Sequence, residues 1–259
     1  MSGTCIRDGG EGVRSVMPTV PNGVISHVER TAPDFVRKLF NDTAPYYDTF
    51  NRLVSLGSGG WYRRRCLIRA GLKPGQSVLD VAIGTGLIAY SAQELVGREG
   101  TVIGLDLSEA MLAEARRKVD IPLVQGMADS LPFADASIDF LVMGYAIRHI
   151  SDLEACFREF RRVLKLDGTL LLLEISKPAK VFFRTVLARY LGRAVPRLSY
   201  WITRQPRVRA LMSYHWETME ACVSPAVISD AMAKAGFAEL VCETWFDLFR
   251  SYVGQRDKL

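Results

Sequence analysis

The sequence predicts an α/β fold with a mostly parallel sheet and helices on both of its faces. Short apolar runs bounded by glycine or proline alternate along the chain with longer helical patterns, as strands alternate with helices in such folds. Runs of this kind are typical of strands that are buried on both faces. The chain has 259 residues, of which 49% are hydrophobic and 24% charged, so a globular protein is expected. This composition excludes a disordered or collagen-like chain, and no apolar run approaches the length of a membrane span.

Two helices are expected before the first strand. The first covers residues 32–40 and should end at the Asn-Asp-Thr-Ala-Pro sequence that closes with Pro45. The second covers residues 61–70 and is ended by Gly71 and Pro74.

Strands and helices then alternate to the end of the chain. Strands are expected over residues 77–81, 101–106, 122–124, 138–143, 169–175, 238–244 and 248–254. Helices are expected over residues 87–96, 108–118, 151–164 and 225–235, with Ser108 as the cap of the second. Parallel sheets of this type bind ligands at the carboxyl ends of their strands, so the functional residues are expected there.

One domain is expected over residues 29–259, preceded by a flexible glycine-rich tail over residues 1–28. Within the domain, residues 29–71 would form an N-terminal helical cap and residues 175–216 an insertion after the fifth strand. This insertion holds nine Lys and Arg and neither Asp nor Glu, whereas the whole chain has a net charge of +5. The basic character of the chain therefore lies in this one segment.

A glycine-rich turn follows the first expected strand. Gly84 and Gly86 let a ligand approach the backbone, and Asp106 at the end of the second strand can accept both hydroxyls of a ribose. The third glycine of the dinucleotide motif is absent after Gly86. Asp80 would repel a pyrophosphate but would suit a cationic amine or sulfonium. The pattern therefore favours a sulfonium cofactor over NAD.

Further motifs extend this pattern along the chain. They are Tyr47-Asp48 with Asn51, Val78 to Gly86, Asp106 to Leu112, Leu131 to Phe133, Ile147 to Asp152, Arg162 to Gly168 and Leu173 to Pro178. On these residues the chain resembles the class I S-adenosylmethionine-dependent methyltransferases and, more narrowly, the UbiE family of ubiquinone/menaquinone C-methyltransferases. The resemblance covers residues 33–255 and implies a Rossmann-like fold with a seven-stranded sheet and S-adenosyl-L-methionine as cofactor. Five cysteines without a CxxC pair and three histidines give no metal motif.

The resemblance implies a cofactor site at the ends of the first, second and fourth strands. Its expected residues are Asp80, Ala82, Gly84, Thr85, Gly86, Asp106, Leu107, Met111, Met127, Ala128, Asp129 and Gly144. The loop around Thr85 would hold the methionine moiety, Asp106 the ribose, and Met127 with its neighbour the adenine. Two positions depart from the family, because Met127 replaces an Asp or Asn and Gly144 replaces a serine. Methionine is a weak hydrogen-bond acceptor, so adenine would rely on main-chain contacts or on Asp129.

The expected catalytic residues are Arg148 and His149, which follow the fourth strand. The family has Arg-Asn here, and it has Asn-Asp where this chain has Asn51 and Arg52. A ring-carbon nucleophile needs its phenol deprotonated, so His149, titrating near neutral pH, would be the base and Arg148 would stabilise the phenolate. A second interpretation is that His149 only caps or packs against the next helix. The expected acceptor-binding residues are Tyr47, Asn51, Tyr145, Tyr190 and Trp201.

The implied reaction is C-methylation of a lipophilic quinol or a related phenolic ring. One alternative is O- or N-methylation of a specialised metabolite such as a quinolone or polyketide, and a phospholipid acceptor is another. A non-catalytic scaffold protein is the alternative from a different class. The presence of Asp80, Gly84, Gly86 and Asp106 argues against it.

The basic segment bears on partners and location. Phe183, Leu187, Tyr190 and Leu191 fall on one helical face within it, beside several arginines. Such a surface suits an anionic membrane, with a solvated lid and a nucleic-acid surface as alternatives. The sequence contains no nucleic-acid module, so no nucleic-acid partner is expected. We expect a cytoplasmic enzyme that binds a lipophilic small molecule, contacts the membrane peripherally and forms a homodimer.

Overall fold

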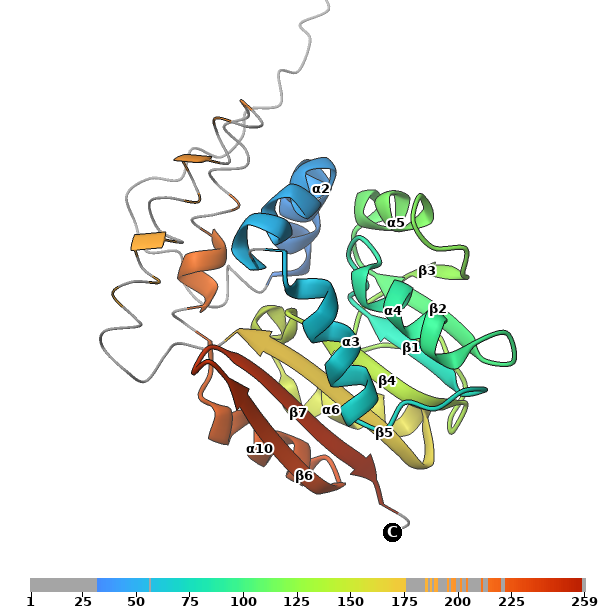
Figure 1. The fold of residues 1–259 in the computed structure, drawn as a ribbon. Helices are drawn as coiled ribbons and strands as arrows, with labels where there is room; N and C mark the ends of the chain where they lie inside the picture. The colour runs from blue at the N-terminus through green and yellow to red at the C-terminus, as the bar shows by residue number, and fades with distance from the viewer. Residues whose placement is uncertain are drawn as a thin grey trace, which may run out of the picture.

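The computed structural model describes residues 32–55, 57–175 and 222–257; between 185 and 219 it describes residues 185, 187, 189, 190, 195, 197, 198, 201, 204, 211 and 214–219. Seven strands form one sheet in the order β3-β2-β1-β4-β5-β7-β6 (Figure 1). Their bounds are β1 Ser77–Val81, β2 Thr101–Asp106, β3 Leu123–Gln125, β4 Ile138–Gly144, β5 Leu164–Ile175, β6 Phe237–Trp245 and β7 Phe249–Arg256. All pairs are parallel except those of β7, which runs antiparallel to β5 and β6. The predicted fold class is confirmed.

Helices cover both faces of the sheet. Their bounds are α2 Pro33–Ser55, α3 Gly59–Arg69, α4 Leu87–Val96, α5 Glu109–Arg116, α6 Leu153–Val163 and α10 Pro225–Lys234, with a 3-10 turn at Ile147–His149. One apolar core joins the sheet to α6 and α10, and the other joins it to α3, α4 and α5. Figure 1 shows α3 and α4 in front of the sheet and α6 behind it. Neighbouring β1 residues alternate between the two cores, with Val78 in one and Leu79 in the other, which explains the continuous apolar run.

The predicted break at Pro45 is wrong, because α2 runs through it as one helix of 23 residues. A proline inside a helix lacks the N–H that would bond to the carbonyl four residues earlier. Packing offsets this loss. The Asn41 side chain accepts hydrogen bonds from the Ser108 hydroxyl at 2.6 Å and the Ala110 amide at 3.3 Å, which tie α2 to the start of α5. The hydroxyl of Thr43 donates to the Leu39 carbonyl at 2.7 Å, inside the same helix.

The other helix and strand bounds agree with the sequence pattern to within about two residues, except that β5 begins at Leu164 rather than at residue 169. Leu164 pairs with Ile138 across a register irregularity, so the strand extends back to the end of α6. The predicted tail and most of the predicted insertion over residues 175–216 lie outside the described residues. Within the described part of the chain, no helix is both long and apolar enough to cross a membrane.

Candidate active site

A cavity lies at the carboxyl ends of β1, β2 and β4, and we call it the strand-end cavity. It is lined by Pro33, Val36, Phe40, Tyr47, Val81, Ala82, Gly84, Leu105, Asp106, Leu107, Met111, Gly126, Met127, Ala128, Asp129, Met143, Gly144, Tyr145, Ala146, His149, Ile150 and Ser151. Nine of the twelve expected cofactor residues are among these, all except Asp80, Thr85 and Gly86. The cavity therefore forms where the strand order predicts a ligand.

Asp106 joins the ends of two strands at this cavity. Its carboxylate accepts a hydrogen bond from the Gly84 amide at 2.8 Å and another from the Ser108 amide at 2.8 Å. Gly84 has a φ of 57°, a left-handed conformation that favours glycine. Burial raises the pKa of Asp106 to about 6, while these backbone amides oppose the shift. The carboxylate thus orders the glycine-rich loop and lies at the cavity wall, as a ribose ligand requires.

Asp80 does not reach the strand-end cavity. Its side chain is fully buried in β1 beneath the glycine-rich loop. Burial raises its pKa to about 8, and the nearby Asp106 adds to the shift. The sequence-based picture of an ionised Asp80 beside a cationic ligand is therefore corrected to a buried, mostly protonated carboxyl at neutral pH.

Thr85 and Gly86 also lie outside the cavity lining. The Thr85 hydroxyl donates to Asp48 of α2 at 2.6 Å, and its carbonyl accepts from Lys118 at 3.1 Å. Lys118 also forms an ion pair with Asp48. Gly86, with a φ of 83°, starts helix α4. These contacts show a loop that is fixed to the N-terminal helix, rather than a hydroxyl that faces the ligand.

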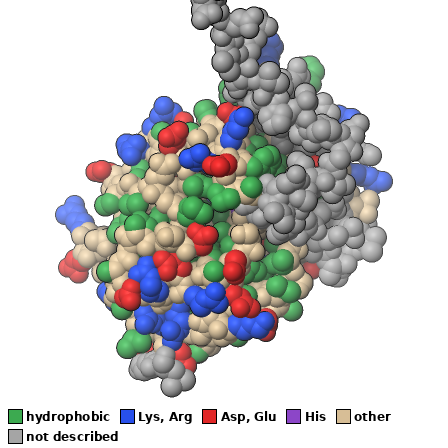
Figure 2. Space-filling view, turned by 180° about the vertical axis from the view of Figure 1, so that it is seen from behind, with side chains coloured by type: hydrophobic (Ala, Val, Ile, Leu, Met, Phe, Trp, Pro, Cys, Tyr) green, Lys and Arg blue, Asp and Glu red, His purple; other side chains and the backbone are tan. Residues whose placement is uncertain are grey.

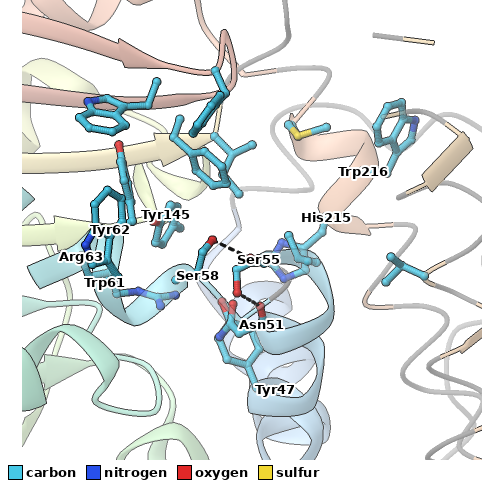
Figure 3. A pocket seen from close by; sticks show the side chains of 18 of the residues that line it. Tyr47, Asn51, Ser55, Ser58, Trp61, Tyr62, Arg63, Tyr145, His215 and Trp216 are labelled. Atoms are coloured by element: carbon cyan, nitrogen blue, oxygen red, sulfur yellow. Dashed lines mark hydrogen bonds between the residues drawn. The ribbon is translucent and has the colours of Figure 1, made fainter. Parts of the chain in front are cut away.

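A second cavity adjoins the first, and we call it the aromatic cavity. It is lined by Tyr47, Asn51, Val54, Ser55, Ser58, Gly59, Trp61, Tyr62, Arg63, Tyr145, Arg148, Ile175, Val195, His215, Trp216, Met219, Trp245, Phe246 and Phe249. Tyr47 and Tyr145 line both cavities. Figure 3 shows residues of α3 and Tyr145 on one side, and Tyr47, Asn51 and Ser55 along α2 near His215 on the other. The two cavities therefore share a wall that includes these two tyrosines.

Arg148 carries a charge into the wall of the aromatic cavity. It forms a buried ion pair with Glu174 of β5, whose Oε1 lies 2.5 Å from Nη1. Burial would lower the pKa of Arg148, but Glu174 offsets it and the net shift is upward, so the guanidinium stays charged. Nη2 of Arg148 lies 2.8 Å from Nδ1 of His215. Since arginine only donates, Nδ1 must accept and a neutral His215 carries its proton on Nε2.

His149 lines the strand-end cavity and not the aromatic cavity. Its Nδ1 lies 2.7 Å from the Tyr214 hydroxyl, and its ring stacks on Tyr214 with planes 8° apart. Nε2 is buried, with no hydrogen-bond partner among the described residues. Burial and the charge of Arg148 lower its pKa well below 6.5. The expectation that His149 titrates near neutral pH is thus corrected, because it is a neutral imidazole there.

The five expected acceptor-binding residues separate into two groups. Tyr47, Asn51 and Tyr145 line the aromatic cavity. Tyr190 and Trp201 do not: the Tyr190 hydroxyl donates to the Leu53 carbonyl at 2.7 Å, and Trp201 is 80% exposed. The basic segment thus supplies a packing contact for α2 at Tyr190, because the hydroxyl of that residue is already bonded to the helix backbone.

Sequence reasoning missed several charged and polar residues of the aromatic cavity. They are Arg63 and His215 of the lining, together with Glu174, which pairs with the lining residue Arg148. Glu174 belongs to the motif at the end of β5 and lies within the last two residues of that strand, so its position at a strand end was a usable signal. Arg63 and His215 lie on helical segments far apart in sequence, and neither belongs to a recognisable motif. The described residues contain no cluster of His, Cys, Asp and Glu that could hold a metal ion.

Comparisons with known proteins agree with this geometry. The sequence model of the ubiE/COQ5 methyltransferase family matches residues 27–245. A demethylmenaquinone methyltransferase of Mycolicibacterium paratuberculosis is 35% identical over 208 residues, 80% of this chain and 86% of that protein. A ubiquinone/menaquinone biosynthesis C-methyltransferase of a Shewanella species is 31% identical over 216 residues, 80% of this chain and 84% of that protein.

Solved structures show the same fold at low sequence identity. A phosphoethanolamine N-methyltransferase of Haemonchus contortus in complex with S-adenosyl-L-methionine has a TM-score of 0.62 and 19% identity, over 92% of this chain and 61% of that chain. A possible histamine N-methyltransferase of Thermotoga maritima has a TM-score of 0.61 and 19% identity, over 85% of this chain and 99% of that chain. At this identity the likeness supports the fold alone.

Proposed function

The chain belongs to the ubiE/COQ5 methyltransferase family and is an S-adenosylmethionine-dependent enzyme, and we propose that it C-methylates a lipophilic quinol or related phenol. The observation that carries the proposal is the pair of adjoining cavities. The strand-end cavity contains Asp106 for the ribose, and the aromatic cavity offers an apolar wall with two arginines. Tyr47 and Tyr145 line both, so a methyl group held in one lies next to a ring held in the other.

S-adenosylmethionine would supply the methyl group: a C–C bond to the ring would form as the C–S bond breaks, and the methylated ring carbon would then lose its proton to restore the aromatic ring. The enzyme mainly aligns the two partners and stabilises the phenolate form of the acceptor. We assign the phenolate oxygen to Arg148, whose charge Glu174 secures, and to the Nε2–H of His215. His215 is a donor and not a base, because its Nδ1 already accepts from Arg148.

His149 remains the proposed base for the phenolic proton; because it lines the strand-end cavity only, this role requires the acceptor hydroxyl to reach past Tyr47 and Tyr145 to Nε2. When its Nδ1–H donates to Tyr214, Nε2 has a free lone pair in a buried position. The lowered pKa makes it a weak base, so the proton moves only because Arg148 stabilises the phenolate. His149→Asn should reduce turnover by about 10²- to 10⁴-fold with an unchanged cofactor Kd. Full turnover in His149→Asn would leave the imidazole a packing group and solvent as the base.

Product analysis tests the reaction itself. The purified enzyme is incubated with S-adenosylmethionine bearing a ¹³C-methyl group and with a reduced short-chain quinol that lacks one ring methyl. We expect the label on a ring carbon by NMR. Label on oxygen would establish O-methylation instead, and label on neither, with several quinols and phenols, would contradict a quinol acceptor.

We also propose that the enzyme contacts an anionic membrane, through a surface formed by α3 and the β6–β7 turn. Trp61, Arg64, Arg65 and Ile68 form the exposed stripe of α3, with Trp61 58% and Ile68 48% exposed. Phe246 in the turn is 84% exposed. Arg65 lies over the rings of Trp61 and Trp245, at 5.5 and 4.9 Å from their centroids. Exposed aromatic and arginine side chains of this kind suit a lipid interface.

Charge and position support a lipid partner for this surface. Between Asp48 and Asp80 the sequence has six Lys and Arg and no acidic residue. Among the described residues, Glu243 supplies the carboxylate that pairs with α3, at Arg69. In contrast to the α3 surface, the face of the molecule that Figure 2 shows, turned by 180° from the view of Figure 1, carries both positive and negative side chains. Trp61 and Phe246 also line the aromatic cavity, so a lipophilic acceptor could enter directly from the bilayer.

Vesicle sedimentation tests this contact. Arg64→Gln with Arg65→Gln should weaken binding to vesicles that contain anionic phospholipid by about 2 kcal/mol, since each basic residue contributes about 1 kcal/mol. Arg116→Gln with Arg117→Gln, an adjacent exposed pair at the C-terminal end of α5, is the matched control. Equal losses of vesicle binding in the two double variants would contradict a specific membrane-binding surface on α3. The predicted contact through residues 175–216 falls mostly outside the described residues.

A further inference from the structure

Arg63 is a buried cation without a counter-ion among the described residues. It is 7% exposed, it lies on α3 and it lines the aromatic cavity. Within the described part of the chain it makes no hydrogen bond and no ion pair, whereas the equally buried Arg148 has Glu174. Removing a guanidinium from water without a partner is costly, so a buried arginine of this kind indicates an anionic ligand.

The local structure holds this guanidinium in place. Its Cζ lies 5.3 Å from the centroid of the Tyr145 ring, a cation–π contact. A Cβ at Gly59, one helical turn earlier, would lie 2.6 Å from Nη1 of Arg63. The absence of a side chain at Gly59 therefore leaves the space that the guanidinium occupies.

Arg63 lines the aromatic cavity and not the strand-end cavity, but it packs against a residue that lines both. Tyr145, against which it packs, directly follows β4 and lines both cavities, as does Tyr47. Burial raises the pKa of Tyr145 to about 12 and that of Asp80 to about 8, and the charge of Arg63 opposes both shifts. The guanidinium is thus electrostatically coupled to the end of β4 and to the residue beneath the glycine-rich loop.

We propose that Arg63 binds the carboxylate of the methionine moiety of S-adenosylmethionine. The proposal rests on the proposed function, in which the acceptor is a neutral phenolic ring and only the methyl donor has a permanent carboxylate. Two other groups near the loop are already occupied: the Thr85 hydroxyl donates to Asp48, and Lys118 pairs with the same carboxylate. In the described part of the chain, Arg63 is the buried cation of the aromatic cavity wall that lacks a hydrogen-bond or ion-pair partner.

Calorimetric titration with two probes tests the assignment. S-adenosylhomocysteine contains the carboxylate, and 5′-methylthioadenosine lacks the whole amino-acid part but keeps the adenosine and the sulfur. Arg63→Met should weaken binding of S-adenosylhomocysteine by roughly 10- to 100-fold, the range for a lost charge-assisted hydrogen bond. Binding of methylthioadenosine should be unchanged. Arg64→Met, an exposed change of the same charge on the same helix, should alter neither affinity.

Two further readouts separate a lost contact from a damaged fold. Arg63→Met removes an uncompensated buried charge, so the Tm of the free protein should stay the same or rise, while the upward shift of Tm by S-adenosylhomocysteine should shrink. Arg63→Lys keeps a positive charge and should retain most of the affinity. Equal weakening of both probes by Arg63→Met would overturn the proposal, and so would a normal S-adenosylhomocysteine Kd with a raised KM for the acceptor. If the unaltered enzyme binds no S-adenosylhomocysteine, the proposed function fails as well.

Discussion

The strand-end cavity and the aromatic cavity share two tyrosines but are built in different ways. The first consists mainly of residues at the ends of consecutive parallel strands, such as Gly84, Asp106 and Gly144. The second combines side chains of α2, α3, the loop after β4, a segment near residue 215 and the β6–β7 turn. The strand-end cavity thus depends on backbone geometry, which the fold imposes. The aromatic cavity depends on side chains that only tertiary packing brings together, and the buried arginines Arg63 and Arg148 belong to its wall.

The largest effect is expected at the ion pair of the aromatic cavity. Glu174→Gln leaves the charge of Arg148 buried without a counter-ion, which costs about 3–5 kcal/mol when one partner of a buried pair is removed. The free energy of unfolding in urea should fall by this amount. Glu154→Gln, which changes a carboxylate that is 44% exposed and pairs with Arg158, should cost less than about 1 kcal/mol. If the free energy of unfolding fell by similar small amounts in both variants, the buried ion pair at the aromatic cavity would not be needed for the stability of the fold.

A pH-dependent change in the free energy of unfolding is expected from Asp80, which is buried in β1. An ordinary aspartate has a pKa near 3.8, and burial raises that of Asp80 to about 8. Between these values the folded state binds the proton that the unfolded state has lost, so stability contributed by Asp80 falls as the pH rises. From pH 5 to pH 7 the loss in the free energy of unfolding is roughly 2–3 kcal/mol, since each pH unit between the two pKa values contributes about 1.36 kcal/mol.

Asp80→Asn isolates this contribution. Unfolding curves in urea at pH 5 and pH 7, for variant and unaltered protein without ligand, should show that the variant loses less stability on going to pH 7. Asp135→Asn, a carboxylate that is 76% exposed, should leave the pH dependence of the unaltered protein in place. An identical pH dependence in Asp80→Asn would show that Asp80 is ionised in the fold, contrary to its burial.

Ligand binding in the strand-end cavity should depend on Asp106 more weakly than folding depends on Glu174. Asp106→Ala removes a charged acceptor for the ribose hydroxyls, so the affinity for S-adenosylmethionine should fall by about 1.5–3 kcal/mol in calorimetry. The same titration with NAD should show no binding to the unaltered enzyme. An unchanged Kd in Asp106→Ala would remove this carboxylate from the binding site.

The contrast between the cavities also explains what the sequence could predict. The strand ends were found because local apolar runs and glycine spacing determine them, and β1 at Ser77–Val81 and β2 at Thr101–Asp106 agree residue for residue. Pro45 was misread because contacts of α2 with α5, far away in sequence, override its local preference. Whether Thr85 faces a ligand or Asp48 is likewise a matter of packing. His215 and Arg63 had no local signal, since each acquires its role only from the elements that surround it.

The smallest expected effect is a gain at the adenine end of the strand-end cavity. Met127 lines this cavity and is 37% exposed, in a position where the family has Asp or Asn. Its thioether accepts hydrogen bonds weakly, whereas the Asn amide oxygen can accept from the exocyclic amine of adenine. Met127→Asn should therefore strengthen S-adenosylmethionine binding by about 0.5–1.5 kcal/mol, the net value of one hydrogen bond. Met127→Leu is the control, since it keeps an apolar side chain of similar size. Weaker S-adenosylmethionine binding by Met127→Asn than by Met127→Leu would mean that the side chain at this position contributes an apolar contact to adenine. Tighter binding by Met127→Asn alone would mean that one local substitution can add the missing hydrogen bond, as expected where the backbone of the strand ends already shapes the cavity.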